Sequence, residues 1–188
     1  MQEVMFGNAV KLAHRVIQKA VAEDDVVVDA TCGNGHDTVF LARLVPRGRV
    51  LAFDKAEQAV ANTSQMLARE GIQERVELYH RDFRDIPMMV ESPVKAVMFN
   101  LGFLPGGPRD TVTCAEESKA GVAGVLPLLA PGGVVTIVCY EGHPGGQDEA
   151  NQIRNLANNL DQKLYEAVEM RFINQVNQPP VLIAVYKR

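Results

Sequence analysis

The feature that most constrains this chain is a short apolar strand that runs into a glycine-rich turn and then into a helix. Residues Asp25–Asp29 place three valines between aspartates, a pattern typical of a buried strand. The turn from Ala30 to Asp37 contains Gly33 and Gly35, and a helical pattern continues from Thr38 to Leu44. Glycine permits positive φ and leaves space for a ligand to approach the backbone. In open α/β sheets, such a turn lies beside the ligand-binding crevice.

The rest of the chain continues this alternation of strands and helices. The expected strands span residues 49–53, 76–79, 94–99 and 134–139, and the expected helices span residues 13–21, 57–70, 113–129 and 148–160. We interpret Pro131–Gly133 as a turn into the fifth strand. Two final strands, 167–173 and 181–186, are joined by a loop too short for a crossover helix, so they should be antiparallel. The pattern predicts one α/β Rossmann-like domain over residues 1–188, with a mostly parallel seven-stranded sheet and helices on both faces.

Composition limits the classes of partner. The chain has 188 residues, of which 47% are hydrophobic, so a proper core can form. A net charge of -4 argues against a protein that coats long nucleic acids, although a local patch could still hold a short RNA element. Cys32, Cys114 and Cys139 form no CxxC pair, so we expect no metal site, no disulfide framework and a reducing cytoplasmic setting. We also expect no signal peptide and no membrane span, because no apolar run approaches ~18 residues.

Polar side chains close the predicted strands. Asp29, Asp54, Asn100 and Tyr140 stand at the end of a predicted strand or directly after it, and Asp82 lies near the end of another. Ligands of open α/β sheets bind beyond the carboxyl ends of the strands. We therefore expect these five residues to surround one site.

The charges of the turn favour a cationic ligand over a pyrophosphate. Asp54 lies 19 residues after Gly35 at the end of the second strand, where a carboxylate can accept both hydroxyls of a ribose. A dinucleotide fingerprint would have a third small residue where Thr38 stands. Asp29 and Asp37 would repel a pyrophosphate but attract the sulfonium and ammonium of S-adenosylmethionine. Helix capping is the alternative role for these two aspartates.

The cofactor prediction extends beyond the turn. Asp82 could accept a hydrogen bond from the adenine amine or could simply be a turn residue. Phe83 could flank the adenine ring, although it also suits a core. The predicted cofactor-binding residues are Asp29, Thr31, Gly33, Asn34, Gly35, His36, Asp37, Thr38, Asp54, Asp82, Phe83 and Asn100.

Two later segments carry the candidate catalytic residues. The side-chain oxygen of Asn100 and the carbonyl of Leu101 could hold an amine and direct its lone pair at a methyl group. An Asx turn is the alternative role for Asn100. Tyr140 offers a face for stacking a base, and His143 could accept a proton, although a loop histidine is often merely exposed.

Three motifs together resemble one bacterial methyltransferase family. They are Asp-Ala-Thr-x-Gly-Asn-Gly-His-Asp-Thr at Asp29–Thr38, Asn-Leu-Gly-Phe-Leu-Pro-Gly-Gly at Asn100–Gly107, and Tyr-x-Gly-His-Pro-Gly-Gly at Tyr140–Gly146. The family was first described as rRNA methylases and is now associated with methylation of 5-aminomethyl-2-thiouridine at the tRNA wobble position. The resemblance covers essentially the whole chain. It implies a class I methyltransferase fold with strand order 3-2-1-4-5-7-6, S-adenosylmethionine as cofactor, and substrate contacts from Asn100 and the third motif.

The resemblance also implies a tRNA anticodon stem-loop as partner, and a homodimer is considered as well. Basic residues that could contact the RNA are Arg47, Arg81, Arg84, Arg109 and Arg154. Other readings stay open: an rRNA base or a small amine as substrate, a nicotinamide-dependent oxidoreductase, or a catalytically silent RNA-binding module.

Overall fold

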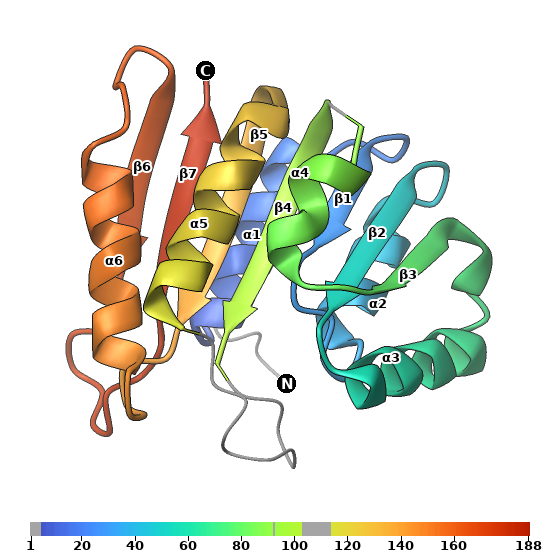
Figure 1. The fold of residues 1–188 in the computed structure, drawn as a ribbon, viewed down its shortest axis with the longest axis horizontal. Coiled ribbons are helices and arrows are strands. Elements are labelled where there is room, and N and C mark those ends of the chain that lie inside the picture. Colours follow the sequence, from blue (N-terminus) through green and yellow to red (C-terminus); the bar gives the residue numbers. More distant parts are fainter. Residues whose placement is uncertain (1–4, 92, 103–113) are drawn as a thin grey trace.

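The computed structural model describes residues 5–91, 93–102 and 114–188, which form a seven-stranded sheet between two layers of helices (Figure 1). The strand order is β3-β2-β1-β4-β5-β7-β6, as expected. Strand β7 runs antiparallel to both of its neighbours, and the other pairs are parallel. The strands are β1 Val26–Asp29, β2 Arg49–Asp54, β3 Val76–His80, β4 Val94–Leu101, β5 Leu129–Cys139, β6 Tyr165–Met170 and β7 Val181–Lys187.

Helices cover both faces of the sheet because its central strands are apolar on both sides. Val27 packs with α1 and α2, whereas Val28 joins the cluster beneath α4, α5 and α6. Such double-sided burial is characteristic of parallel sheets. The helices are α1 Ala9–Ala20, α2 His36–Leu44, α3 Glu57–Glu70, α4 Ile86–Met89, α5 Ala115–Val125 and α6 Gly146–Asn158, with 3-10 turns η1 Gln73–Arg75, η2 Phe83–Asp85 and η3 Leu126–Leu128.

Two glycines set the beginning of α2 and the end of α3. Gly35 stands at the N-cap of α2 with φ of 87°, so the helix begins at His36, two residues earlier than the sequence predicted. Gly71 ends α3 with φ of 66°, as expected of a glycine C-cap. Both positions need the left-handed backbone that glycine adopts without strain.

The predicted turn at Pro131–Gly133 is wrong, because these residues lie inside β5. The strand begins at Leu129, which pairs with Val94, and the next printed pair joins Ala96 to Val134. Five steps along β5 thus match two steps along β4, and this register shift absorbs the Pro-Gly-Gly segment as a bulge. Turn-forming residues in a strand pattern can mark either feature, so sequence alone did not separate them.

The predicted bounds of β6 are also wrong. The strand spans Tyr165–Met170 rather than residues 167–173, because its pairing with β7 ends where Met170 meets Leu182. Ile173, beyond this point, is exposed. Arg109 and the predicted capping box at Thr113 lie outside the described residues. Within the described ranges, no helix is both long and apolar enough to cross a membrane.

Candidate active site

The glycine turn after β1 is fixed by hydrogen bonds from two neighbouring elements. The amide of Gly33 donates to Asp54 Oδ2 at 3.0 Å, and the hydroxyl of Thr63 on α3 donates to the Gly33 carbonyl at 3.1 Å. A Cβ at Gly35 would lie 3.1 Å from the Cα of Thr63, so α3 packs directly on the turn. Asn62 of the same helix donates to Asn34 Oδ1 at 2.8 Å. The turn is therefore rigid and presents backbone, not side chains, to a ligand.

Asp54 stands at the end of β2 as a fixed acceptor. Its Oδ1 accepts from the amide of Ala56 at 2.9 Å, and its Oδ2 accepts from Gly33. Each carboxylate oxygen keeps a further lone pair. The side chain can therefore receive hydroxyl groups, as the ribose prediction for Asp54 requires.

Asp29 lies behind the turn and is almost fully buried. Its Oδ1 accepts from the amide of Thr31 at 3.1 Å, and its Oδ2 accepts from the hydroxyl of Thr38 at 2.6 Å. Burial, and then the charge of Asp37, raise the pKa of Asp29 to about 7. A cationic ligand beside the turn would favour the charged form. Thr38 thus anchors Asp29 at the position where a dinucleotide fold would have a small residue.

Asn100, near the end of β4, is held in one orientation by the turn. Its backbone amide donates to Thr31 Oγ1 at 2.8 Å, and its Nδ2 donates to Asp37 Oδ2 at 3.2 Å. Its Oδ1 is buried and has no hydrogen-bond partner within the described part of the chain. A buried acceptor left unpaired costs about 1–3 kcal/mol. The amide oxygen is therefore placed to receive a donor from a ligand.

Tyr140 lies next to Asn100, just beyond the end of β5. Its ring packs on Gly102, where an added Cβ would lie 3.3 Å from Tyr140 Cδ2. Burial and the charge of Asp37 raise the pKa of Tyr140, and a hydrogen bond with Asn100 partly offsets them. The phenol is therefore neutral at physiological pH. The structure thus brings Asn100 and Tyr140, at the ends of β4 and β5, together with Thr31 of the turn and Asp37 of α2.

Other predicted site residues have structural partners of their own. Asp82 caps η2 and pairs with Arg84 through hydrogen bonds of 2.9 and 3.1 Å. Burial opposes ionisation of Asp82, but the Arg84 contacts prevail and lower its pKa. Phe83 is buried against the edge of Phe99, with ring centroids 5.7 Å apart, and Gly121 lies on it. These contacts are those of a turn residue at Asp82 and of a core residue at Phe83, the alternative roles that the sequence allowed.

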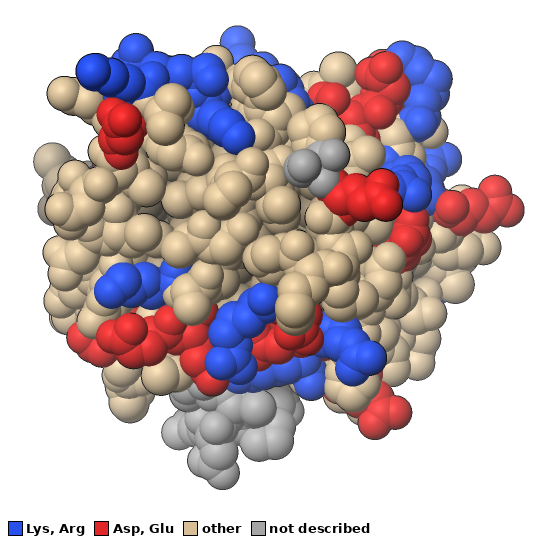
Figure 2. Space-filling model, turned by 45° about the horizontal axis from the view of Figure 1, so that its top comes forward, with Lys and Arg blue, Asp and Glu red and all other residues tan. Residues whose placement is uncertain are grey.

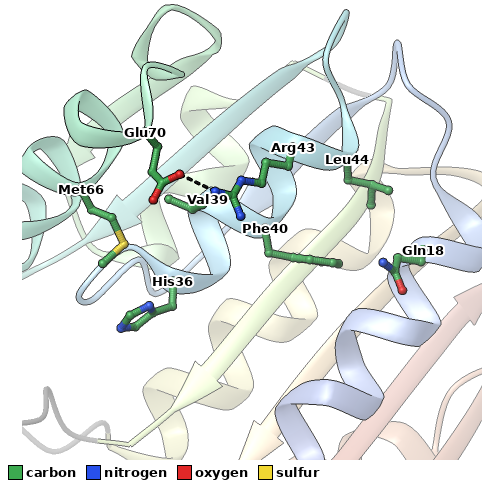
Figure 3. Close-up of a pocket in the computed structure, with 8 residues that line it drawn as sticks. All are labelled: Gln18, His36, Val39, Phe40, Arg43, Leu44, Met66 and Glu70. Atoms are coloured by element: carbon green, nitrogen blue, oxygen red, sulfur yellow. Dashed lines mark hydrogen bonds and ion pairs between the residues drawn. The ribbon is translucent and has the colours of Figure 1, made fainter. Parts of the chain in front are cut away.

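Three other predicted residues do not direct their side chains at the cluster around Asn100. His36 is exposed and lines a surface hollow of about 610 Å³ on the outer side of α2 (Figure 3). Leu101 is fully buried and pairs with Cys139 of β5. His143 bonds through Nδ1 to the carbonyl of Pro144 at 2.9 Å and lies against the start of α6.

Most of the arginines proposed to contact RNA are engaged with carboxylates. Arg47 pairs with Glu23 and precedes β2, so it lies at the N-terminal end of the strand, whereas the site lies at the C-terminal ends of the strands. Arg84 pairs with Asp82, as described above. Arg154 pairs with both Glu141 and Glu169. Figure 2 shows one face of the molecule, where acidic and basic side chains lie next to one another along the lower rim and Lys and Arg side chains gather at the upper left.

Glu141, directly after Tyr140, is the centre of a charged cluster. Arg171 donates to it at 2.7 and 3.0 Å, and Arg154 of α6 donates as well. Burial opposes ionisation, but the hydrogen bonds from Arg171 and Arg154 outweigh it and hold the pKa of Glu141 at about 2. The segment after β5 is thereby tied to α6 and to the segment after β6.

Sequence reasoning missed several residues that build the site. His14 of α1 bonds to Asp37, and Thr63 of α3 bonds to the glycine turn, as Arg171 does to Glu141. Each partner lies more than 20 residues away along the chain. None of the three belongs to a motif, so no local signal could have found them.

The strand order, the rigid glycine turn and the fixed acidic side chains together define a methyltransferase of the Rossmann-like class. Residues 50–186 match the family model described as "Putative rRNA methylase". The chain belongs to this family.

Similar proteins cover nearly all of the chain. A tRNA (mnm5s2U34)-methyltransferase of Arabidopsis thaliana chloroplasts is 31% identical over 98% of this chain and 72% of its own length. The crystal structure of a "putative rRNA-methylase" from Clostridium thermocellum superposes with a TM-score of 0.95 at 39% identity, over 98% of this chain and 100% of that one. A Streptococcus mutans methyltransferase solved in complex with SAH gives 0.89 at 31% identity, with the same coverages.

Proposed function

We propose that this single-domain enzyme methylates the exocyclic aminomethyl nitrogen of a modified uridine at the wobble position of tRNA. The chain is an S-adenosylmethionine-dependent RNA methyltransferase, in keeping with its family and its structural neighbours. The observation that supports an amine acceptor is the buried, unpaired Oδ1 of Asn100 within the described residues. The plant relative, whose name specifies this wobble nucleoside, supports the choice of RNA.

The residues around the turn fit the methyl donor. Asp54 would accept the ribose hydroxyls, and the backbone of Gly33 to Gly35 would approach the methionine part of the donor. The neighbouring carboxyl groups of Asp29 and Asp37 would supply negative charge for its ammonium and sulfonium. When bound, S-adenosylmethionine supplies an activated methyl group to a nucleophile.

Asn100 and Tyr140 would prepare the acceptor. An alkyl amine has a pKa of about 10, and only its neutral form has a lone pair to attack with. A neighbouring positive charge lowers that pKa, because two like charges repel. The Asn100 oxygen then accepts an N–H of the neutral amine, which turns the remaining lone pair toward the methyl group. Tyr140 offers its ring as a stacking surface for the uridine.

A labelling experiment tests the proposal. The protein is incubated with S-adenosylmethionine carrying a labelled methyl group and with tRNA that lacks the final methylation, and the digested nucleosides are identified by mass spectrometry. The label is expected in the wobble uridine. Label only in a tRNA nucleoside other than the wobble uridine, or no label in tRNA despite measurable binding of the donor, would exclude the wobble substrate.

A matched pair of variants locates the chemistry. Asn100→Ala should lower kcat roughly 100-fold, the order of loss seen when a reacting group is misplaced, while the Kd for S-adenosylmethionine stays within about twofold. Asn155→Ala, on the exposed face of α6, removes the same side chain away from the site and should leave both constants unchanged. An equal loss of kcat and donor affinity in Asn100→Ala would assign Asn100 to cofactor binding or folding instead.

A further inference from the structure

His14 of α1 is linked to the proposed amine-binding residue through a single carboxylate. Its Nε2 lies 2.7 Å from Asp37 Oδ1, and the other oxygen of Asp37 accepts from Asn100 Nδ2 at 3.2 Å. The three side chains come from α1, α2 and β4. They form a continuous path from the helix layer to the end of the central strand.

The imidazole of His14 is itself held in place. It stacks on Phe40 with ring centroids 3.7 Å apart and an angle of 4° between the ring planes. The side chain of His14 is 24% exposed, and that of Asp37 is 9% exposed. The Asp37 carboxylate is thus largely shielded from water, so its orientation depends on the donors that contact it.

The orientation of Asp37 determines the orientation of Asn100. An asparagine amide can flip by exchanging its nitrogen and oxygen, and the two arrangements differ only in hydrogen bonding. Because a carboxylate accepts but does not donate, Asp37 must face Nδ2, which leaves Oδ1 directed away from it. We propose that His14 is a positioning residue that holds Asp37 so that the Asn100 oxygen faces the acceptor amine.

This inference rests on the proposed function of Asn100, and two substitutions separate its parts. His14→Phe keeps a flat ring to stack on Phe40 but removes the donor to Asp37. His14→Gln loses the ring but restores an N–H donor at a similar reach. A role in packing alone would favour the Phe variant, whereas a role in positioning favours the Gln variant.

The kinetic test is a double-mutant cycle with Asn100→Ala, measured as kcat on undermethylated tRNA. His14→Phe should lower kcat about tenfold in the wild-type background and have no further effect in the Asn100→Ala background, because residues that act as a unit are not additive. His14→Gln should recover most of the lost rate. An equal fractional loss in both backgrounds, or a Gln variant as slow as the Phe variant, would overturn the proposal.

A second measurement does not depend on the substrate. In protein labelled with ¹⁵N-asparagine, the side-chain NH₂ signal of Asn100 is assigned by its absence in Asn100→Ala. The signal should shift or broaden in His14→Phe and return in His14→Gln. An unchanged signal in His14→Phe would refute the positioning role, whether or not the wild-type enzyme is active on tRNA. Inactivity of the wild-type enzyme on tRNA would count against the wobble substrate alone.

Discussion

Replacing Glu141 with Gln should destabilise the protein in a pH-dependent manner. Glu141 is 8% exposed and receives hydrogen bonds from Arg154 and Arg171. Its pKa falls from 4.5 to about 2, which corresponds to about 3 kcal/mol of stability at neutral pH. For a chain of this size, that amount shifts the Tm by roughly 6–12 °C.

The sign of the pH dependence follows from the lowered pKa. The folded protein keeps Glu141 ionised where the unfolded chain already binds a proton, so the stabilisation is full above pH 4.5 and is lost as the pH falls toward 2. Urea unfolding of the wild type and of Glu141→Gln from pH 7 down to pH 3 measures this difference. A difference that stays constant across this range, or one below about 1 kcal/mol at pH 7, would refute the reasoning.

Three further changes have defined outcomes. Because the pKa of Asp29 is raised from 3.8 to about 7, the folded state retains a proton that the unfolded chain loses. The stability of the wild type should therefore fall as the pH rises from 4 to 7, and thermal melts of Asp29→Asn should show a smaller fall. Gly35→Ala forces an L-residue to φ of 87° with its Cβ 3.1 Å from Thr63 Cα. Calorimetry should show weaker binding of S-adenosylmethionine, and chemical denaturation should show a free energy of unfolding lower by about 1–2 kcal/mol. Unchanged values would contradict the rigid turn. Gly121→Ala places a Cβ 2.4 Å from the Phe83 ring, so unfolding should become easier by about 1–3 kcal/mol; a neutral effect would show that the ring moves freely.

The fold was predictable because its signals are local. The valine run of β1, the Gly-x-Gly turn and the capping glycine at Gly71 each follow from a few neighbouring residues, and alternation along the chain indicated the parallel sheet. Errors arose where pairing decides the outcome. Pro131–Gly133 has the composition of a turn, but the register between β4 and β5 makes it a bulge.

The site was predictable to the extent that it follows from strand ends. The places of Asp54 and Asn100 near the ends of β2 and β4 were predicted in this way, because the carboxyl ends of parallel strands meet on one side of a sheet. The residues that orient them could not be found. His14 meets Asp37 only after α1 has packed against the sheet, and Asp82 turned out to be paired with a neighbouring arginine.

The order of the strands separates the residues proposed to bind the methyl donor from those proposed to bind the acceptor. The turn, Asp54 and α3 belong to the half of the sheet built around β1, β2 and β3, whereas Asn100 lies near the end of β4 and Tyr140 directly follows β5. Hydrogen bonds from Asn100 to Thr31 and Asp37 cross between the halves. Under the proposed roles, substitutions beyond β4 should change which nucleophile is accepted while the residues proposed to hold the methyl donor stay intact, so the same donor residues would serve relatives that modify different molecules.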